Sequence, residues 1–595
     1  MPQLRVAMAQ IDTTVGDLDG NVRTIREWTR EAAADGAHLV LFPETAVTGY
    51  PVEDLALRRS FVDASRQALG RLARELADDG NGDVTVVVGY VDSSEAHAGG
   101  SRRLPQNCAA VLHGGRVVAR YAKHHLPNYG VFDEYRIFVP GRDLLVVRVK
   151  GVDVAVAICE DLWQDGGPVQ RAGDAGAGLL AVLNASPYER NKDDVRLELV
   201  ARRAAEADCP IAYVNAVGGQ DELVFDGDSL VVDQHGTTLA RGPQFRESLV
   251  VTDLDLPDGV ATPGWEENVQ RVTVSTEPVP AYEPRPAEVH EPLPDVADVH
   301  AAIVLGLRDY VCKNGFRSVV IAVSGGIDSA LVASLACDAI GPENVVGISL
   351  PSGYSSQHSK DDAQDLANRC GFEYRQYAIA PMVDAFLATV PLHGVAEENL
   401  QARVRGTTLM GLANQEGHLT LATSNKSELA VGYSTLYGDS VGGYAPLKDV
   451  PKTLVWELSR WRNAEAVARG QQPPIPENTI SKPPSAELRP DQTDQDSLPP
   501  YEVLDAILED YVEGDKGRAD MLAAGFDGTL VDSVVTLVDR AEWKRRQFAP
   551  GPKISLKAFG RDRRLPITNR WREPTAQESL TPPVETKTDL SAGQD

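Results

Sequence analysis

The feature that most constrains the fold of this chain is the hexapeptide Ser324-Gly325-Gly326-Ile327-Asp328-Ser329. The residues before it (318–323) are apolar and mostly β-branched, which predicts a buried parallel strand. The residues after it (330–336) have the composition and apolar spacing of a helix. The chain therefore runs from a strand through a glycine turn into a helix. This order predicts an α/β architecture with a ligand site at the helix N-terminus.

The side chains and backbone of the hexapeptide suit a phosphate group. The two glycines allow positive φ and close approach of the backbone to a ligand, while Ser324 and Ser329 add hydroxyl donors. Asp328 adds a carboxylate suited to Mg²⁺. The pattern is not a Walker A loop, because Gly-x-x-x-x-Gly-Lys-Ser/Thr does not occur there. A serine-glycine turn without a ligand is the alternative, but the spacing resembles the SGGxDS loop of ATP pyrophosphatases. Those enzymes cut ATP between its α and β phosphates and leave AMP on a carboxylate.

Length and composition limit the function classes. A chain of 595 residues is too long for one core and should form at least two domains. The net charge of −28 argues against binding to nucleic acids and to anionic membranes. The six cysteines are scattered without a Cys-x-x-Cys pair, which argues against a structural zinc site. The N-terminus reads as a strand and not as a signal peptide, and no apolar run has membrane-spanning length. We therefore expect a cytoplasmic protein with reduced thiols.

The first half of the chain alternates apolar strands with helical segments, which predicts an α/β layer architecture. Three predicted strands are followed by reactive groups, namely Glu44, Lys123 and Cys159. Each has an ordinary interpretation when taken alone: a helix cap, a solvated charge and a buried small residue. Together they can attack an amide. A cysteine needs a base to take its proton, and a lysine can favour the thiolate and stabilise the oxyanion.

The order Glu44, Lys123, Cys159, each in its local context, resembles the nitrilase (carbon–nitrogen hydrolase) superfamily over residues 2–255. The resemblance implies a four-layer α-β-β-α sandwich, with Glu44 as general base, Lys123 as oxyanion stabiliser and Cys159 as nucleophile. It also implies that Glu134 is the second glutamate of the site. The stretch from Asn184 to Lys192 resembles the glutamine-binding loop of glutaminase members. By that resemblance, the substrate is glutamine, held by Tyr129, Ser186 and Lys192.

The middle of the chain is rich in proline and glutamate and predicts an extended linker, with a short strand at 271–274. We therefore divide the chain into residues 1–255, a linker at 256–299, a second domain at 300–573, and a disordered tail at 574–595. The second domain should open with a helix at 301–312. Its alternating strands and helices predict a doubly wound parallel sheet, with the ligand beyond the carboxyl ends of the strands.

Four polar stretches of the second half occur in an order that closely resembles NAD synthetases, at residues 397–405, 421–428, 437–452 and 482–496. By composition alone each is a solvated helix face or a loop, and the last looks like an active-site lid. Together with the nitrilase half they resemble the glutamine-dependent synthetases of this family. That resemblance implies that ATP adenylates the nicotinate carboxylate of deamido-NAD, and that ammonia from glutamine then displaces AMP to give NAD.

The resemblance also assigns residues to substrates. ATP would contact the hexapeptide (Ser324, Gly325, Gly326, Ile327, Asp328 and Ser329) and Thr423. Mg²⁺ on the pyrophosphate would be held by Asp328 and Glu428. Deamido-NAD would contact Asn399, Arg403, Glu428, Tyr433, Ser434, Thr435, Leu436 and Lys544. One departure is Ala422, where many relatives have glycine. The family further implies a homo-oligomer, and the chemistry of ammonia favours a shielded path between the sites.

Three alternatives stay open from the sequence. The chain could be an amidase whose second half only regulates it. It could also be a glutamine-dependent ligase with a different amidation target, such as a purine nucleotide. The third interpretation is a non-catalytic binding protein. It is disfavoured because a scaffold does not need Glu44, Lys123, Cys159, Asp328 and Glu428 together.

Overall fold

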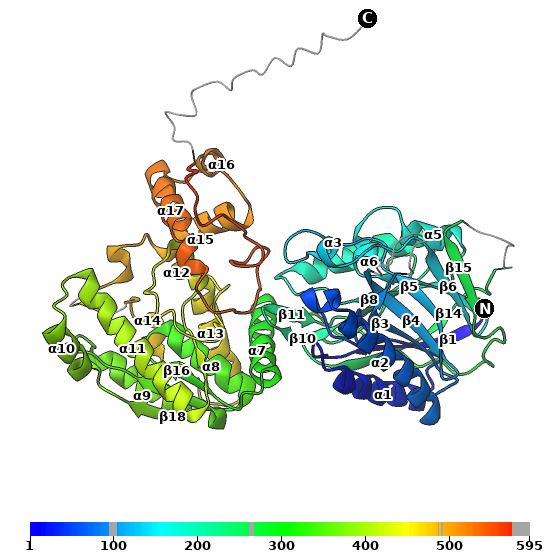
Figure 1. Ribbon diagram of the computed structural model, residues 1–595, viewed down its shortest axis with the longest axis horizontal. Helices are drawn as coiled ribbons and strands as arrows, with labels where there is room; N and C mark the ends of the chain where they lie inside the picture. The colour runs from blue at the N-terminus through cyan, green and yellow to red at the C-terminus, as the bar shows by residue number, and fades with distance from the viewer. Residues whose placement is uncertain (95–103, 261–266, 486, 490–491, 574–595) are drawn as a thin grey trace, which may run out of the picture.

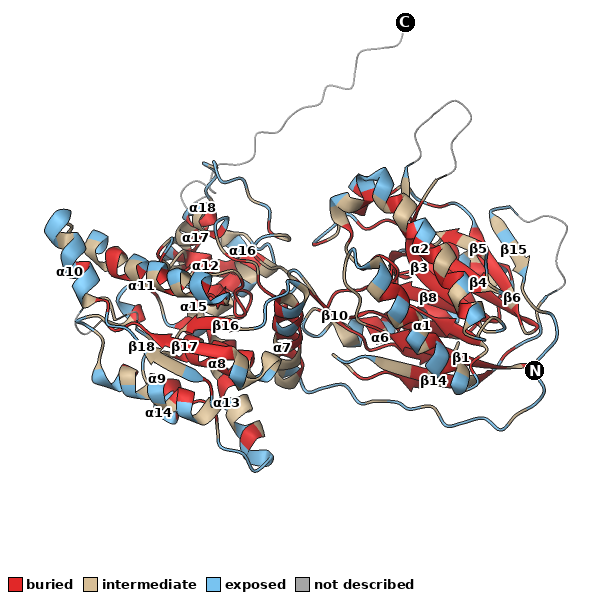
Figure 2. Ribbon diagram, turned by 60° about the horizontal axis from the view of Figure 1, so that its bottom comes forward, coloured by how far each residue is buried: buried red, intermediate tan, exposed pale blue. Residues whose placement is uncertain are grey.

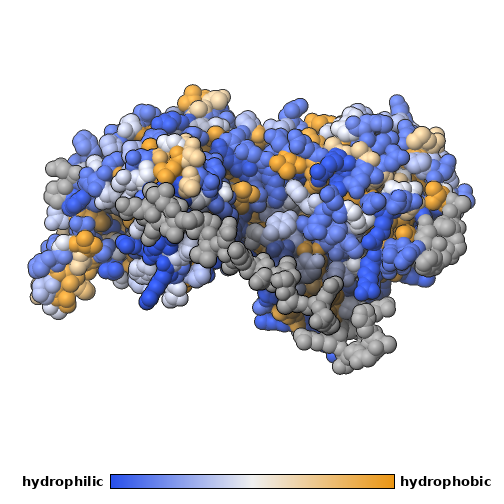
Figure 3. Space-filling model, turned by 90° about the horizontal axis from the view of Figure 1, so that it is seen from above, coloured by the Kyte–Doolittle hydropathy of each residue, from blue (hydrophilic) through white to orange (hydrophobic). Residues whose placement is uncertain are grey.

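The structure is a computed structural model that describes residues 1–94, 104–260, 267–485, 487–489 and 492–573. The tail predicted at 574–595 lies outside these residues. The chain forms two bodies, with helix α7 (Asp295–Lys313) at the junction between them (Figure 1). Buried residues concentrate in the sheets and in α7 (Figure 2). The face seen in Figure 3 is mostly hydrophilic, with hydrophobic residues in small scattered groups, as expected for a chain with a net charge of −28.

Two sheets form the centre of the N-terminal body. The first is six-stranded, in the order β14-β1-β2-β3-β4-β5, and the second is seven-stranded, in the order β13-β12-β9-β8-β7-β6-β15. The strands of the first sheet are β1 (Gln3–Gln10), β2 (Leu39–Leu41), β3 (Thr85–Ser93), β4 (Pro105–His113), β5 (Arg116–Ala122) and β14 (Ser248–Asp255). Those of the second are β6 (Leu144–Val149), β7 (Val152–Ile158), β8 (Leu179–Asn184), β9 (Ile211–Asn215), β12 (Leu230–Val232), β13 (Thr238–Arg241) and β15 (Val269–Thr273).

Three hydrophobic clusters make this body a four-layer sandwich. One cluster joins the two sheets, and includes Leu4 and Val6 of β1 with Val154 and Val156 of β7. Another joins the first sheet to the outer helices α1 (Leu18–Ala34) and α2 (Arg59–Asp78). The third joins the second sheet to α5 (Pro168–Asp174) and α6 (Lys192–Ala207). The predicted α-β-β-α fold class is confirmed. Shorter elements are the 3-10 helix η1 (Glu53–Leu57), α3 (Glu134–Ile137), α4 (Glu160–Trp163), and the hairpin strands β10 (Val217–Gln220) and β11 (Leu223–Asp226).

The segment predicted as a linker contains more structure than expected. Strand β15 begins at Val269, two residues before the predicted 271, and pairs in parallel with β6 at the edge of the second sheet. Helix α7 begins at Asp295, six residues before the predicted 301. The earlier start has a local cause, because Pro294 precedes the helix and its first turn carries the acidic residues Asp295 and Asp298.

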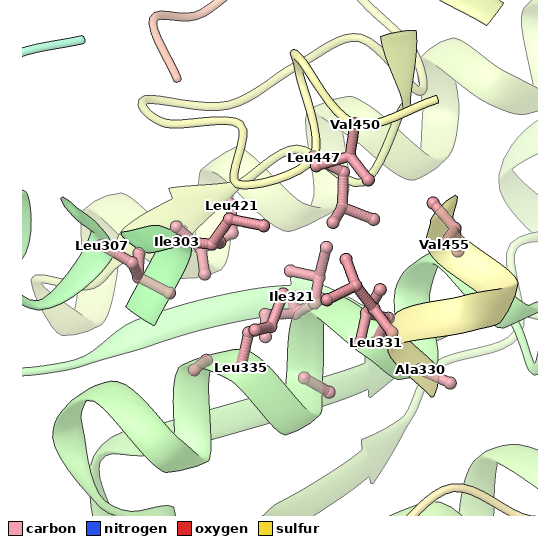
Figure 4. Packing of buried hydrophobic residues seen from close by; sticks show 14 of the residues in the cluster. Ile303, Leu307, Ile321, Ala330, Leu331, Leu335, Leu421, Leu447, Val450 and Val455 are labelled. Atoms are coloured by element: carbon pink, nitrogen blue, oxygen red, sulfur yellow. The ribbon is translucent and has the colours of Figure 1, made fainter. Parts of the chain in front are cut away.

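The C-terminal body is built on a four-stranded parallel sheet in the order β18-β17-β16-β19. Its strands are β16 (Val319–Ala322), β17 (Val345–Ser349), β18 (Glu373–Gln376) and β19 (Leu419–Leu421). In its core, Ile321 of β16 meets Leu331 and Leu335 of α8 (Ile327–Ile340), and Ile303 and Leu307 come from α7 (Figure 4). The remaining elements around the sheet are α9 (Gln357–Cys370), α10 (Ala380–Thr389), α11 (Val395–Glu416), α13 (Lys452–Ala468), α14 (Glu477–Ser481), and the 3-10 helices η2 (Pro342–Asn344) and η3 (Asp494–Asp496). The predicted parallel sheet is confirmed.

A further group of helices packs around its own hydrophobic cluster at the end of the chain. These elements are α12 (Lys426–Val431), α15 (Tyr501–Leu508), the π-helix η4 (Glu509–Glu513), α16 (Arg518–Ala523), α17 (Gly528–Arg540) and α18 (Glu542–Arg545). Within the described ranges, no helix is long and apolar enough to cross a membrane.

The two bodies are joined by packing and by ion pairs. The core of the C-terminal body extends into the N-terminal one through Tyr188, Val217 and Val224. Polar contacts surround this core: Arg190 Nε donates to Asp295 Oδ1 at 2.7 Å, and Lys553 Nζ donates to Glu189 Oε1 at 2.8 Å. Tyr188, Glu189 and Arg190 belong to the predicted glutamine-binding loop, so the C-terminal body holds that loop directly.

Two candidate active sites

The first site lies where strands of both sheets of the N-terminal body end. Glu44 follows β2, Lys123 follows β5, and Cys159 follows β7. Lys123 Nζ donates to Glu44 Oε1 at 2.8 Å and to Glu134 Oε1 at 3.0 Å, and all three side chains are buried. Cys159 is 4 % exposed and has a φ of 44°, a left-handed conformation that non-glycine residues rarely adopt. The sharp turn between β7 and α4 therefore holds the thiol in a strained position, as is common at reactive residues.

The charges of this site favour a neutral thiol and a charged lysine at rest. Burial raises the pKa of Cys159 well above its usual range, and Glu44 adds to the rise while Lys123 opposes it. Burial works against the charge of Lys123, but Glu134 and Glu44 outweigh it and raise its pKa well above the ordinary value. Burial also raises the pKa of Glu134 to about 7, against the opposing effect of Lys123. The thiol therefore needs a neighbouring base before it can react.

The three predicted glutamine-binding residues make different contacts around this site. Tyr129 donates its hydroxyl to Glu160 Oε2 at 2.8 Å, directly beside Cys159 in the chain. Ser186 is buried and its N–H donates to Asn215 Oδ1 at 2.9 Å. Lys192 instead donates to Pro187 O at 3.0 Å and lies 5.8 Å above the ring of Trp163. Its observed contacts stabilise the loop rather than the Glu44–Lys123–Cys159 group.

Sequence reasoning missed two side chains that support the reactive group. Asn107 of β4 donates to Glu44 Oε1 at 2.6 Å. Asp161 is fully buried and accepts hydrogen bonds from the N–H groups of His124 (3.0 Å) and Ile158 (3.0 Å). It therefore connects the strand end at Lys123 to the strand end at Cys159. Asp161 could have been found by its place two residues after Cys159. Asn107 gave no such signal, because it lies inside a strand far from the other residues in sequence.

The second site is a cavity of about 280 Å³ at the carboxyl ends of β16, β17 and β19. Of the predicted ATP contacts, Ser324, Gly326, Ile327, Asp328, Ser329 and Thr423 line it. Gly325 is not among the lining residues. It has a φ of +84°, and a Cβ there would meet Ser359 O at 2.2 Å. Its role in the structure is therefore to let the loop turn closely past α9.

A lysine lies between the two carboxylates predicted to bind the metal. Lys452 Nζ donates to Asp328 Oδ2 and lies 3.6 Å from Glu428 Oε1. Burial, and then repulsion by Asp328, raise the pKa of Glu428 to about 8, while Lys452 opposes the rise. Asn425 Nδ2 also donates to Asp328 Oδ1 at 3.0 Å. Sequence reasoning singled out the loop up to Lys452 but did not predict its position between the carboxylates.

The predicted deamido-NAD contacts form one network that continues from the cavity. Glu428, Tyr433 and Thr435 line the cavity itself. Next to them, Thr435 Oγ1 donates to Asn399 Oδ1 at 2.7 Å, and Arg403 Nε donates to Leu436 O at 3.2 Å. Lys544 Nζ donates to Ser434 O at 2.9 Å, and burial lowers the pKa of Lys544. The structure thus brings together α11, the loop after α12, and α18.

Two nearby arginines of α11 have different surroundings. Arg403 is exposed, whereas Arg405, which sequence reasoning did not select, lines the cavity and donates Nε to Leu350 O at 3.0 Å. Two residues apart on a helix, the side chains point in different directions. Burial lowers the pKa of Arg405. The predicted lid also reaches the cavity through Lys482, whose Nζ donates to Asp362 Oδ2 at 2.7 Å.

Comparisons with known proteins agree with this two-part geometry. The family model for carbon-nitrogen hydrolases matches residues 5–263, and the model for NAD synthases matches residues 299–548. The glutamine-dependent NAD(+) synthetase of Acinetobacter baylyi is 43% identical, over 96% of this chain and 99% of its own length. The enzyme of the same name from Thermotoga maritima is 44% identical, over 96% of this chain and all of its own length. The chain belongs to the glutamine-dependent NAD(+) synthetase family.

Solved structures of the glutamine-dependent NAD(+) synthetase family agree with the fold. The protein of Acinetobacter baumannii, solved in complex with ADP, is 39% identical and covers 96% of this chain with a TM-score of 0.70. The protein of Cytophaga hutchinsonii, at 22% identity, shows the same fold with a TM-score of 0.76 over 95% of this chain. The family resemblance predicted from the sequence is therefore confirmed, and the amidase and binding-protein alternatives lose their support.

Proposed function

We propose that this protein makes NAD from deamido-NAD, ATP and glutamine, with AMP, pyrophosphate and glutamate as the other products. The observation that carries the proposal is the presence, in one chain, of a buried Glu44–Lys123–Cys159 group and of a cavity of about 280 Å³ lined by residues of the 324–329 loop. Membership in the glutamine-dependent NAD(+) synthetase family supports the same reaction.

In the first half-reaction, Glu44 takes the thiol proton of Cys159 as the sulfur attacks the amide carbon of glutamine. The ammonium of Lys123 stabilises the negative charge that develops on the amide oxygen. The proton passes to the leaving nitrogen, ammonia departs, and a thioester remains on Cys159. Water then attacks the thioester with Glu44 again as base, and glutamate is released. Tyr129, Ser186 and Lys192 are the proposed contacts of the amino-acid end of glutamine.

In the second half-reaction, a carboxylate oxygen of deamido-NAD attacks the α-phosphorus of ATP, and pyrophosphate leaves. Ammonia then attacks the adenylated carbon, AMP leaves with the C–O bond electrons, and the amide of NAD forms. The 324–329 loop and Thr423 would hold ATP. Asn399, Arg403, Glu428, residues 433–436 and Lys544 would hold the dinucleotide. Adenylation suits the chemistry, because a free carboxylate is a poor electrophile.

The residues of the cavity fit Mg²⁺ only in part. Asp328 and Glu428 supply carboxylate oxygens. Burial, and then repulsion by Asp328, raise the pKa of Glu428, and a cation between the two carboxylates would relieve that repulsion. Within the described part of the chain, no group of three or more His, Cys, Asp or Glu side chains could hold a metal ion. Phosphate oxygens and water would therefore complete the shell, and Lys452 would have to release Asp328. When bound, the ion would neutralise charge on the departing pyrophosphate.

Several properties of the working enzyme follow from the same proposal. Ammonia in open water is mostly protonated and unreactive, so the two sites should be joined by a shielded path through the interface beside α7. The glutamine-binding loop, which the C-terminal body holds, lies next to that interface. We also expect a homo-oligomer located in the cytoplasm.

The test is one reaction containing glutamine labelled with ¹⁵N at the amide, ATP, Mg²⁺ and deamido-NAD, analysed by mass. Labelled NAD in equal amount with AMP and glutamate is the expected result. The Cys159→Ala variant should lose all use of glutamine yet keep NAD formation from ammonium, because the nucleophile is absent only from the first site. Glutamate without NAD would instead point to a glutaminase that serves a different amidation target.

A further inference from the structure

Asn107 is the side chain of the first site that no role described so far explains. It lies in β4, is 1 % exposed, and its Nδ2 donates to Glu44 Oε1 at 2.6 Å. Its main-chain carbonyl accepts the N–H of Lys123 at 2.9 Å. Asn107 therefore contacts both the carboxylate of Glu44 and the main chain of Lys123, whose ammonium donates to the same carboxylate.

The position of Asn107 in its strand makes an amide unexpected there. Side chains alternate along a strand, so Asn107 shares a face with Ala109 and Val111. Both of these belong to the hydrophobic cluster between the two sheets. Cys108 and Ala110, on the opposite face, belong to the cluster under the outer helices. The polar Asn107 thus ends an otherwise apolar row, at the point where the row reaches Glu44.

The amide also leaves one of its own atoms without a partner. Asn107 Oδ1 is buried and accepts no hydrogen bond from any residue that the structure describes. A buried acceptor without a partner destabilises a fold. Turning the amide over does not help, because Oδ1 would then face a carboxylate oxygen at 2.6 Å. Features that cost stability without a packing benefit are expected at functional positions.

The two carboxylate oxygens of Glu44 have different hydrogen-bond partners. Oε1 accepts from Asn107 and from Lys123, at 2.6 and 2.8 Å. Oε2 accepts only the longer bond from the N–H of Ala185, at 3.2 Å, among the described residues. Two donors on one oxygen fix the rotation of the carboxylate. Because Asn107 is neutral, it does this without adding a second positive charge, which would weaken Glu44 as a base.

We propose that Asn107 is a positioning residue for Glu44: it fixes Oε1 so that Oε2 is free to take the proton of Cys159. This inference rests on the proposed glutamine hydrolysis at Cys159. The ionisable groups around Glu44 are Lys123, Glu134, Cys159 and Tyr50, whose hydroxyl donates to Glu134 Oε1 at 3.2 Å. None of them replaces the second donor on Oε1.

The main experiment compares Asn107→Leu with Gln106→Leu. Both changes remove a buried amide from β4, but Gln106 lies on the opposite face of the strand. Asn107→Leu should lower kcat for glutamine hydrolysis about 10- to 100-fold, with KM for glutamine nearly unchanged. The acid limb of its pH–rate profile should move to higher pH, because a carboxylate that loses a donor keeps its proton longer. Gln106→Leu should behave like the parent protein, and ammonium-dependent NAD formation should be equal in all three.

A second measurement needs no substrate. The rate at which iodoacetamide alkylates Cys159, followed by peptide mass mapping over a range of pH, reports how readily Glu44 takes the thiol proton. Asn107→Leu should slow this alkylation, and Gln106→Leu should not. If the parent releases no glutamate from glutamine, the proposed function falls, and the alkylation rates alone decide the role of Asn107.

Folding failure must be kept apart from loss of positioning. Asn107→Asp preserves the shape of the side chain but replaces the donor with an acceptor, so it should reproduce the kinetic losses of Asn107→Leu. Its thermal unfolding reports whether the N-terminal body is folded, and its ammonium-dependent activity reports whether the C-terminal body is intact. The proposal is overturned if a folded Asn107→Leu or Asn107→Asp variant matches Gln106→Leu in kcat, in pH profile and in the alkylation rate of Cys159.

Discussion

Replacing Lys123 by methionine should destabilise the N-terminal body strongly, and more at high pH than at low pH. Methionine has a similar length and fills irregular apolar space, so the change mainly removes the charge. The lost ammonium lies 2.8 Å from Glu44 and 3.0 Å from Glu134, and its side chain is 1 % exposed. Removing one partner of a buried ion pair leaves uncompensated charge and costs about 3–5 kcal/mol.

The pH dependence follows from Glu134. Burial already raises its pKa from 4.5 to about 7 while Lys123 opposes the rise, so Lys123→Met should raise it further. A carboxyl group whose pKa is higher in the folded state binds extra protons on folding. Its unfavourable effect on stability is therefore absent below pH 4.5, grows between pH 4.5 and the folded-state pKa, and is constant above that pKa. In the parent, the rise from 4.5 to about 7 already costs about 3 kcal/mol. The added penalty of Lys123→Met comes only from the further rise, so it appears above about pH 7. The Lys123→Met penalty should be largest near pH 8 and much smaller near pH 5.

Scanning calorimetry of the full chain at pH 5 and pH 8 tests this reasoning. A loss of about 3–5 kcal/mol in a body of this size lowers Tm by roughly 10 °C. The transition of the N-terminal body is the one that ATP does not shift, since ligand binding stabilises only the body that binds it. Adding Glu134→Gln to Lys123→Met should recover part of the loss, because one buried carboxylate is gone. An unchanged Tm at pH 8, or a further loss in the double variant, would refute the reasoning.

Two other predictions concern the second site. Lys452→Met should reduce AMP release with ammonium at least about 100-fold, because the positive charge that balances Asp328 and Glu428 is lost. AMP release is measured by chromatography, and a decrease of less than tenfold contradicts this prediction. Gly325→Ala should lower Tm and weaken ATP binding, measured by calorimetric titration, because the φ of +84° and a Cβ 2.2 Å from Ser359 O would strain the loop. Gly353→Ala is the matched control, because nothing lies within 4 Å of its Cβ, and it should change neither Tm nor ATP binding.

The sequence alone determined the parts of this protein that depend on local pattern. The strand, glycine turn and helix around 324–329 predict the phosphate loop, because each element is specified by neighbouring residues. Glu44, Lys123 and Cys159 could be selected because each stands at a predicted strand end, in a local context that resembles the nitrilase superfamily. Strand ends are where α/β folds place reactive groups. The α/β architecture followed from the same local patterns, and the family followed from the resemblance of these motifs to known enzymes.

Only the tertiary structure decided which distant residues meet. Lys452 reaches Asp328 across 124 positions of sequence, and Asn107 reaches Glu44 across 63. Nothing local distinguishes Asn107 from an ordinary buried amide, or Arg405 in the cavity from the exposed Arg403. The strand β15 owes its position to pairing with β6, more than a hundred residues earlier in the chain. Such contacts depend on how sheets and helices pack, and packing couples residues that no short stretch of sequence contains together.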